Sequence, residues 1–447
     1  MSNDVAGLAM QGRNAELVLA LVSPLGTPLD GVQRALSDAL AAHGYRIGAL
    51  VRISYLLSEM AQIEPKERPE AKQERLMEMG NALRRHHGGD YLALTAITHI
   101  NASRDQDGNG EVLPQERRAH VIRSLKHPDE VTRLRHVYKQ GLFLLGVSAP
   151  RRLRLKTLLD QNFPLDEANR LLDKDAAEED RIGQQTRDTF ELSDAFLWVD
   201  RDEEVMRRKV LRIIDLLMSC PFHPPTRQEH AMFMAYASAL SSSDLSRQVG
   251  AVVTNREGDM IATGANDAPA FGGGTYWPTR VGFDYETKED EGPDYLRGYD
   301  SNERERNKIL ARVIEAIVPE EAQRSDLSAA EQRRALVDRY KNRLKGTGLL
   351  DLTEFGRAVH AEMAALLSCA RSGISPVGGT LYCTTFPCHN CAKHIIAAGI
   401  ASVVYVEPYP KSRAKDLHGE AISLPNEDDD ELDGSRVEFK AFEGVGP

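Results

Sequence analysis

Two short segments near the C-terminal end constrain what this chain can fold into more than any other part of it. The first is His360–Ala361–Glu362, and the second is Pro-Cys-His-Asn-Cys at 387–391, with 24 residues between Glu362 and Pro387. One imidazole and two thiolates provide three ligands for Zn²⁺ and leave the fourth tetrahedral position open for water. The sequence therefore predicts a fold that brings His360, Cys388 and Cys391 together around zinc.

The local sequence around these ligands favours a reactive site. Cys388 and Cys391 are three residues apart, so a helix that begins there carries both sulfurs on one face, and its N-terminus favours the thiolate form. Glu362 lies two residues beyond His360, near the start of the helical run HAEMAALLSCA. We predict that Glu362 moves protons at the metal-bound water without binding the metal itself.

A purely structural zinc site is the alternative, and it would need a fourth protein ligand. His389, His394 and Cys383 are the nearby candidates. A structural site has no use for a glutamate two residues after the histidine or for a proline before the Cys-x-x-Cys pair. We therefore favour the catalytic interpretation.

The remaining cysteines predict no second metal site and no disulfide framework. Cys220 and His223 lack a second pair at similar spacing and are expected to be turn and surface residues, whereas Cys369 lies on an apolar helix face and is expected in the core. Five cysteines in 447 residues indicate a reducing compartment. The N-terminus shows no export signal and no apolar run approaches the ~20 residues that cross a bilayer, so we expect a cytoplasmic protein without a membrane partner.

The overall charge argues against a protein that binds duplex nucleic acid. The chain has 56 Lys+Arg against 67 Asp+Glu, a net charge of −11, whereas neutralising a phosphate backbone needs a basic face. A local basic pocket for one small anion is compatible with this composition.

Strand and helix signals alternate through the first half, which predicts a parallel α/β sheet. A second unit begins near 220–225 with a helix and a hairpin, and a charged insertion follows at about 270–355. The charged stretch at 173–187 is expected to be a solvated helix or lid, and the acidic run at 426–433 a solvated loop. The expected strands are 16–22, 46–53, 119–125, 142–147 and 196–199, then 248–254 and 260–264, with helices at 232–240, 308–317 and 331–344.

The segment 358–408 resembles the deoxycytidylate deaminase branch of the cytidine deaminase superfamily, through VHAEMAALL and GGTLYCTTFPCHNCAKHIIAAGIASVVYVEP. The segment 246–269, SRQVGAVVT and GANDAP, resembles the same branch. The resemblance implies that Asn266 contacts the nucleotide sugar and that Arg247 lies near the substrate phosphate. A turn-capping asparagine and a surface arginine are the alternatives.

The N-terminal half resembles a P-loop nucleotide kinase, and the two-part layout is similar to the anti-phage dCTP deaminases. The resemblance implies an N-terminal P-loop kinase-like three-layer domain at 14–215 and a C-terminal cytidine-deaminase-like α/β/α domain at 222–447. In the segment EPYPKSRAKDLH, Lys411 and Lys415 are candidate triphosphate contacts, with a solvated basic helix as the alternative.

The kinase-like half departs from a working P-loop. A Walker A loop needs G-x-x-x-x-G-K-[ST], but Ser23–Asp30 reads SPLGTPLD, without the lysine. Pro28 also removes a backbone N–H that could hold phosphate. Phosphoryl transfer is therefore not expected, and Ser23, Gly26 and Thr27 are predicted at most to bind a regulatory nucleotide. The basic set Arg151, Arg152 and Arg154 is a candidate anion-binding lid, and a scaffold that only mediates assembly is the alternative.

These observations favour a zinc-dependent hydrolase that deaminates dCTP, and also dCMP, to deoxyuridine nucleotides and ammonia. By resemblance this activity would deplete the dCTP pool during phage infection, under control of the N-terminal half by a nucleotide or RNA. One alternative is a deaminase acting on cytosine or adenine in tRNA or single-stranded DNA, and another is a non-catalytic nucleotide-sensing regulator with structural zinc. The resemblance also implies a homo-oligomer.

Overall fold

A computed structural model describes residues 15–62, 67–105, 112–177, 185–200, 202–277, 292–317, 328–344, 347–351, 355–407, 413–424 and 434–446. The structure divides into two compact units, each described by itself. One unit comprises 1–233, 385–389 and 401–447, and the other comprises 234–384 and 390–400.

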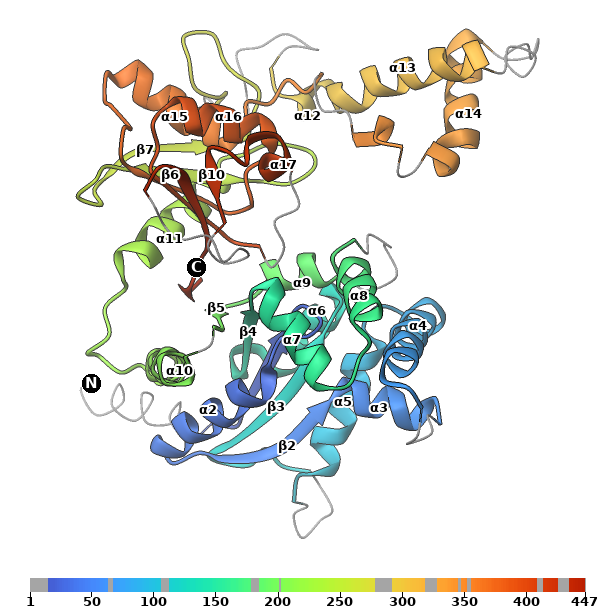
Figure 1. Cartoon of the computed structure of the whole chain (residues 1–447), viewed down its shortest axis with the longest axis vertical. Coiled ribbons are helices and arrows are strands. Elements are labelled where there is room, and N and C mark those ends of the chain that lie inside the picture. The colour runs from blue at the N-terminus through green and yellow to red at the C-terminus, as the bar shows by residue number, and fades with distance from the viewer. Residues whose placement is uncertain are drawn as a thin grey trace, which may run out of the picture. The chain divides into compact units, whose positions relative to one another are not determined.

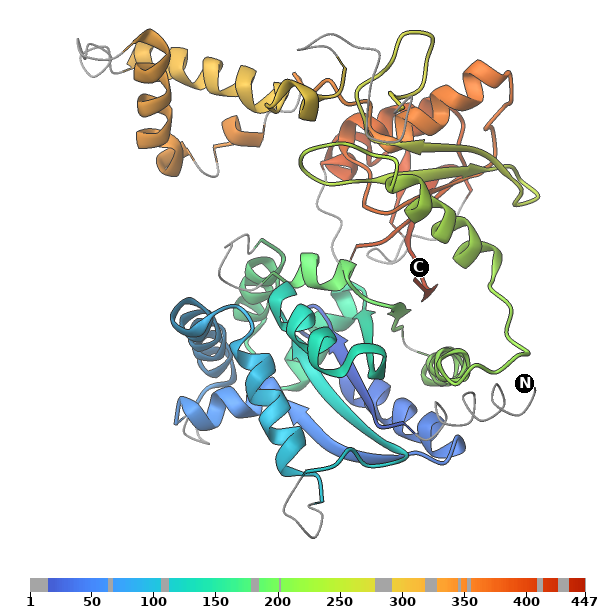
Figure 2. The same ribbon diagram turned by 180° about the vertical axis from the view of Figure 1, so that it is seen from behind.

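The chain is a mixed α/β protein with two six-stranded sheets that are rich in parallel pairs (Figures 1 and 2). The first sheet has the order β12-β5-β4-β1-β3-β2, and all its pairs are parallel except the one between β12 and β5. All five strands predicted in the first half are confirmed, with ends shifted by at most one residue. The strands are β1 (Leu17–Val22), β2 (Arg46–Arg52), β3 (Arg118–Leu125), β4 (Leu142–Ser148), β5 (Ala195–Trp198) and β12 (Gly444–Val445).

Continuous apolar runs explain why the inner strands β1, β4 and β5 are buried on both faces, whereas the edge strand β2 is largely half-buried or exposed. Leu19 and Leu21 of β1 belong to the core formed with α2 and α10, whereas Val18 and Ala20 are buried on the opposite face. Helices therefore cover both faces of this sheet and give three layers. The helices are α2 (Leu29–Ala42), α3 (Ile53–Met60), α4 (Pro69–His87), α5 (Tyr91–Ala102), α6 (Pro128–Tyr138), η1 (Lys139–Gly141), α7 (Arg151–Asp160), α8 (Leu165–Ala177), α9 (Thr186–Glu191) and α10 (Glu203–Leu217).

The second sheet has the order β10-β11-β9-β8-β6-β7. The predicted hairpin is confirmed, because β6 and β7 pair antiparallel around the turn at 255–259. The strands are β6 (Gly250–Thr254), β7 (Met260–Ala265), β8 (Thr380–Cys383), β9 (Ser402–Tyr405), β10 (Ile422–Ser423) and β11 (Val437–Ala441). The helices are α11 (Arg227–Ala239), α12 (Asp294–Arg297), α13 (Ser301–Ile317), α14 (Ala329–Lys341), η3 (Asn342–Leu344), η4 (Leu349–Asp351), α15 (Ala361–Ser372), α16 (His389–Ala397) and α17 (Ala414–His418).

Two residues of the charged stretch at 173–187 differ from the solvated helix that its composition predicted, whereas Asp173 lies exposed on α8 as expected. Asp175 and Thr186 are buried, because Lys126 at the end of β3 binds both of them. Charge density along one segment does not reveal such a partner on a distant strand.

The predicted domain limits at 14–215 and 222–447 remain predictions, and the short strand β12 from the C-terminal end pairs with β5 of the first sheet. The acidic run at 426–433 and Lys411 lie outside the described residues. Among the described helices, none is long and apolar enough to cross a membrane.

Candidate metal centre and a second cavity

The start of α15 positions the first ligand and the candidate proton carrier. His360 is the N-cap residue and Glu362 lies in the first turn, with a side chain that is buried. This turn packs closely on β7, since a Cβ atom on Gly264 would lie 2.3 Å from the Ala361 carbonyl oxygen. A side chain at position 264 would therefore push the start of α15 away from the strand.

The two cysteines come from the start of α16, as their spacing predicted. Cys391 lies in the first turn and is buried, whereas Cys388 directly precedes the helix. The ligand atoms of His360, Cys388 and Cys391 all lie within 4.8 Å of one another. Cys391 Sγ and His360 Nδ1 are 3.3 Å apart, close to the roughly 3.5 Å that Zn–S and Zn–N bonds at a tetrahedral angle imply. This donor set fits zinc.

A fourth protein ligand is absent from this cluster among the residues that the structure describes. His389, His394 and Cys383, the candidates for a closed site, are not part of it. Three ligands with one open position are the arrangement of catalytic zinc sites. The geometry thus defines a three-ligand metal centre that can accept a water molecule or a substrate atom.

The burial predicted for Cys369 is confirmed. Cys369 is fully buried, and burial raises the pKa of its thiol, which keeps it in the neutral form. His223 binds Asp215, and neither it nor Cys220 belongs to a metal-binding group in the described part of the chain.

The candidate nucleotide contacts Asn266 and Arg247 lie on one loop system beside β6 and β7. The Asn266 side chain accepts a hydrogen bond from the Val249 N–H at 2.6 Å and donates one to the Arg247 carbonyl at 2.8 Å. Ser242 donates to the Asn266 side chain as well. Asn266 therefore fixes the backbone at Arg247, which agrees with the turn-capping alternative, and its second amide hydrogen is not used by these bonds.

The loop after β1, Ser23–Pro28, is called the β1 loop below. Gly26 adopts a positive φ of 79°, and an added Cβ there would lie 2.6 Å from the Arg154 carbonyl oxygen. The Thr27 hydroxyl donates to the Pro24 carbonyl within the same loop. The cationic group near this loop comes from elsewhere, because Lys126 Nζ donates to the Ser23 carbonyl at 2.9 Å.

A cavity of about 190 Å³ lies against the β1 loop and the end of β3. Its basic lining residues are Arg84, Arg123 and Lys126, and Asp175 also lines it. Sequence reasoning missed all four, since they are scattered over 92 residues and belong to no motif. The one available signal was a lysine directly after a predicted strand of a parallel sheet, where ligands commonly bind.

The predicted anion-binding lid is engaged in other contacts. Arg151 pairs with Asp173 at 2.7 Å and Arg152 with Asp200 at 3.7 Å. Arg154 is buried and donates to the Ala149 carbonyl. These arginines hold α7 to its surroundings.

Comparison with known proteins finds a family model that spans the metal centre. Residues 225–407 match the family "Cytidine and deoxycytidylate deaminase zinc-binding region". This part of the chain, which contains His360, Glu362, Cys388 and Cys391, is therefore similar to that zinc-binding region.

Individual relatives agree over a short stretch. ComE operon protein 2 of Bacillus subtilis (strain 168) is 47% identical over 53 residues, which are 12% of this chain and 28% of that protein. The deoxycytidylate deaminase of Enterobacteria phage T4 is 47% identical over 55 residues, which are 12% of this chain and 28% of that protein. The match thus spans less than a third of each relative.

Solved structures give two further likenesses. A dCMP deaminase from cyanophage S-TIM5 in complex with dCMP and dUMP has 19% identity and a TM-score of 0.26, and the match covers 49% of this chain and 99% of that one. A shikimate kinase from Acinetobacter baumannii has 12% identity and a TM-score of 0.27, and the match covers 48% of this chain and 99% of that one.

Proposed function

We propose that the chain is a zinc-dependent hydrolase that deaminates deoxycytidine nucleotides, dCMP and dCTP, to deoxyuridine nucleotides and ammonia. The observation that carries the proposal is the three-ligand cluster of His360, Cys388 and Cys391, with a buried glutamate in the turn that follows His360. A structural site would need a fourth protein ligand, which the described residues do not add to this cluster, and it has no use for the glutamate.

Each residue of the centre has a chemical task. The zinc ion would supply Lewis acidity and lower the pKa of a bound water towards neutrality. Cys388 and Cys391 would hold the ion as thiolates and His360 as a neutral imidazole. Glu362 takes one proton from the attacking water and delivers it to the pyrimidine ring nitrogen, and it then passes the second proton, from the hydroxyl group added at C4, to the amine that leaves as ammonia.

A free nucleotide suits this chain better than a nucleic-acid polymer. The net charge is −11, and a polymer needs a basic channel that follows its backbone. Arg247 and Asn266 are the proposed contacts to the substrate phosphate and sugar. Deamination of tRNA or single-stranded DNA is the alternative, and it predicts turnover of an oligonucleotide.

A role for the N-terminal half in controlling dCTP turnover during phage infection is supported by one chain of contacts inside a single compact unit. Arg187 of α9 binds Glu407, and Glu407 Oε1 accepts the Thr385 hydroxyl at 2.7 Å. Thr385 begins the short segment that leads to Cys388. A shift of α9 would therefore reach the loop that carries one zinc ligand.

The activity is tested by ammonia release and product mass from zinc-loaded protein given dCMP, dCTP, CTP or a cytosine-containing oligonucleotide. Turnover of dCMP or dCTP, lost in Glu362→Gln, is the expected result. Turnover of the oligonucleotide alone would replace the proposal with nucleic-acid editing. Full phage protection by cells that express Glu362→Gln would favour the non-catalytic regulator.

The coupling is tested with Arg187→Gln, because this change breaks the contact with Glu407 and touches no proposed zinc ligand. Arg135→Gln is the matched control, since Arg135 also pairs with a carboxylate, Asp194, in the same half. We expect Arg187→Gln to change kcat of dCTP turnover by at least about threefold, and Arg135→Gln to leave it unchanged. Equal kcat values for all three proteins would contradict the coupling.

A homo-oligomer is part of the same proposal. A groove of about 520 Å³ between α11, β7 and α15 is lined by Trp277 and Leu367, whose side chains are 67% and 44% exposed. A contiguous patch of exposed apolar side chains commonly marks a contact between proteins. Light scattering on purified protein at several concentrations gives the oligomeric state, and a monomer at all of them would contradict this part.

A further inference from the structure

We propose that Asp267 is a positioning residue of the proposed deaminase, because its carboxylate and backbone join the loop that carries Arg247 to the segment that carries His360. The loop is 240–249, between α11 and β6, and is called the serine loop below. All of these residues belong to the second compact unit. The inference rests on the proposed function, which gives Arg247 the substrate phosphate and His360 the metal.

Asp267 is a buried carboxylate that accepts hydrogen bonds from three neutral donors. Its side chain follows β7, and the residue is only 3% exposed. Oδ2 accepts the Ser243 N–H at 2.9 Å and the Ser243 hydroxyl at 2.7 Å, and Oδ1 accepts the Ala268 N–H at 2.6 Å. Burial of a carboxylate is costly unless such bonds replace its water. The three bonds therefore hold the serine loop to the end of β7.

The backbone of Asp267 bonds to the residue directly before the first candidate zinc ligand. The Val359 N–H donates to the Asp267 carbonyl at 2.8 Å, and the Asp267 N–H donates to the Val359 carbonyl at 3.3 Å. His360 follows Val359 and is the N-cap residue of α15, with an extended backbone (φ −63°, ψ 152°). The place from which the His360 side chain enters the cluster therefore depends on where Asp267 holds Val359.

A second pair of residues holds the serine loop beside the first. The Ser242 hydroxyl donates to the Asn266 carbonyl at 2.6 Å, and the Asn266 side chain donates to the Arg247 carbonyl at 2.8 Å. Two neighbouring serines thus bond to two neighbouring residues after β7. Of these two contacts, the one at Asp267 also bonds to the segment before His360. Asp267 therefore sets the distance between the proposed phosphate contact and the metal centre.

The hydrogen bonds explain why an aspartate suits this position and an asparagine does not. Both carboxylate oxygens only accept hydrogen bonds, whereas an amide has one oxygen and an NH₂ group that only donates. The donors of Ser243 approach one oxygen of Asp267 and the Ala268 N–H approaches the other. Asparagine would direct its NH₂ group at a donor in either orientation. Asp267→Asn therefore keeps the size of the side chain and loses at least one of the bonds.

A residue that only stabilised the fold would differ from a positioning residue in a measurable way. Loss of folded protein would affect every ligand of the site equally. A shift of Arg247 relative to the metal centre would instead affect a ligand with a phosphate more than one without. dUMP and deoxyuridine share base and sugar and differ in the phosphate, and as reaction products they are not consumed during the measurement.

The first measurement is the dissociation constant of each product from the zinc-loaded full chain by isothermal calorimetry. Asp267→Asn should raise the value for dUMP by at least about tenfold and that for deoxyuridine by less than about threefold, because Arg247 meets only the phosphate. Asp259→Asn is the matched control, since it removes the same charge at the exposed turn before β7 and should bind as wild type does. An equal change for both ligands, or no change, would overturn the link to Arg247.

The second measurement is zinc affinity by competition with a chelator. Asp267→Asn should lower it by about tenfold, the lower end of the range for groups that hold metal ligands in place. Asp259→Asn should bind zinc as wild type does, and an unchanged affinity of Asp267→Asn would overturn the link to His360. Neither measurement needs turnover. A wild-type protein without ammonia release would contradict the proposed function, whereas these two results would still decide the inference.

Ser243→Ala is the second variant, and it keeps the inference testable should Asp267→Asn fail to fold. It removes the hydroxyl donor and leaves the backbone N–H, so the dissociation constant of dUMP should rise by about threefold. Ser241→Ala is its control, since that hydroxyl donates to the Ser238 carbonyl of α11. The double variant of Ser243 and Asp267 should bind dUMP no more weakly than Asp267→Asn alone. Effects that multiply would show that Ser243 does not act through Asp267 and would overturn the proposal.

Discussion

The segment 384–388, called the zinc loop here, and the β1 loop have the same place between a strand and a helix, but their charged or metal-binding side chains come from different parts of the chain. Each connects a strand to the N-terminus of a helix: β8 to α16 in the first case, β1 to α2 in the second. The zinc loop and the following turn carry Cys388 and Cys391 themselves. The β1 loop carries no charged side chain, and its cation, Lys126, reaches it from the end of β3.

The difference shows why a metal site can be recognised as a short sequence motif, whereas an anion site need not be. A metal ion needs ligand atoms at fixed positions, so its ligands stay in a short recognisable pattern. An anion needs only enough donors directed to one point, and side chains from separate elements can provide them. The β1 loop lacks a Walker lysine, and the cation beside it is Lys126, which follows β3.

The largest effect is expected from the removal of a candidate zinc ligand. Cys391→Ser should lower zinc affinity by more than about 100-fold, because even changes outside the ligand set cost about 10–100-fold. Metal analysis of purified protein measures this, with ammonia release as a second readout. Cys220→Ser is the control, since Cys220 lies outside the cluster. Full zinc occupancy in Cys391→Ser would contradict the assigned ligand set.

The next largest effect should come from the proton carrier. Glu362→Gln should reduce kcat by about 10²–10⁴-fold, because general acid–base catalysis by one side chain contributes that much. The zinc content should stay at the wild-type level, which separates this residue from the ligands. Glu420→Gln, at an exposed position, should turn over substrate as wild type does. A kcat of Glu362→Gln within threefold of the wild-type value would show that this glutamate is not the proton carrier.

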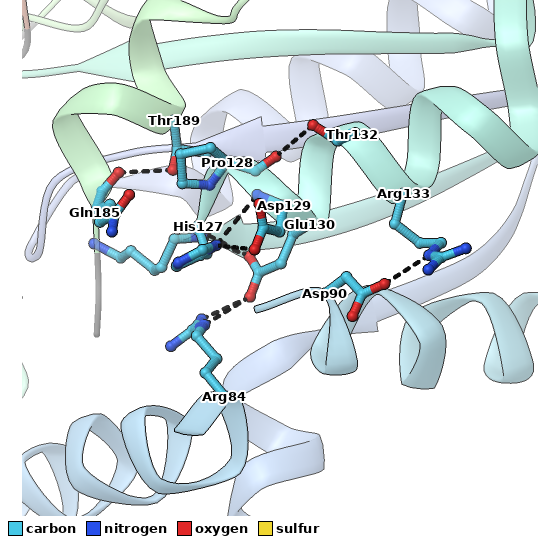
Figure 3. Close-up of polar contacts among 11 residues, drawn as sticks. Arg84, Asp90, His127, Pro128, Asp129, Glu130, Thr132, Arg133, Gln185 and Thr189 are labelled. Atoms are coloured by element: carbon cyan, nitrogen blue, oxygen red, sulfur yellow. Dashed lines mark hydrogen bonds and ion pairs between the residues drawn. The ribbon is translucent and has the colours of Figure 1, made fainter. Parts of the chain in front are cut away.

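In the unit of the first sheet, the buried Arg84–Glu130 ion pair (Figure 3) should contribute more to stability than the exposed ion pairs of Glu74. Glu130→Gln should lower the free energy of unfolding by about 3–5 kcal/mol, because it leaves the buried Arg84 charge without its partner. Glu74→Gln, which breaks the exposed pairs with Arg170 and Lys174, should cost less than about 1 kcal/mol. Denaturant unfolding measures both, and equal losses would show that burial of the Arg84–Glu130 pair has no special role.

The smallest expected effect is a pH dependence at the start of β1. Burial raises the pKa of Glu16, but hydrogen bonds from Arg104, His120 and the Gln115 N–H outweigh it and hold the pKa below its ordinary value. A lowered pKa means that the carboxylate stabilises the fold above about pH 4.5, and that this contribution is lost as the pH falls through the folded-state pKa.

The free energy of unfolding of wild type should therefore decrease more steeply below about pH 4.5 than that of Glu16→Gln. Urea unfolding between pH 3 and 7 measures the two slopes. Glu116→Gln, at an exposed position, should follow the wild-type slope. Parallel curves for wild type and Glu16→Gln would contradict the stabilising role of this carboxylate.

Much of the fold could be predicted because its signals are local. β1, β4 and β5 are apolar runs of four to seven residues, and the β6–β7 hairpin surrounds a turn rich in polar residues, so hydrophobic runs and turn residues were sufficient to predict them. The cluster of candidate zinc ligands was predictable from local patterns, because His360 is the N-cap of α15 and Cys388 and Cys391 lie at the start of α16. Lys411 stays a prediction, and so do the substrate contacts of Asn266 and Arg247.

The sequence by itself predicted the strands of the first sheet and the candidate site residues His360, Glu362, Cys388 and Cys391, since each of these signals lies within one short segment. The fold decided that the segments with His360 and with Cys388 and Cys391 meet. Only the tertiary structure decided the cavity of the first sheet. Arg84, Lys126 and Asp175 are 42 and 49 residues apart in turn, and they meet because β1 and β3 are neighbours in the sheet. Asp175 resembles a solvated charge in its own segment, and it is buried because its partners, Lys126 and the Leu25 N–H, come from the segments that follow those two strands.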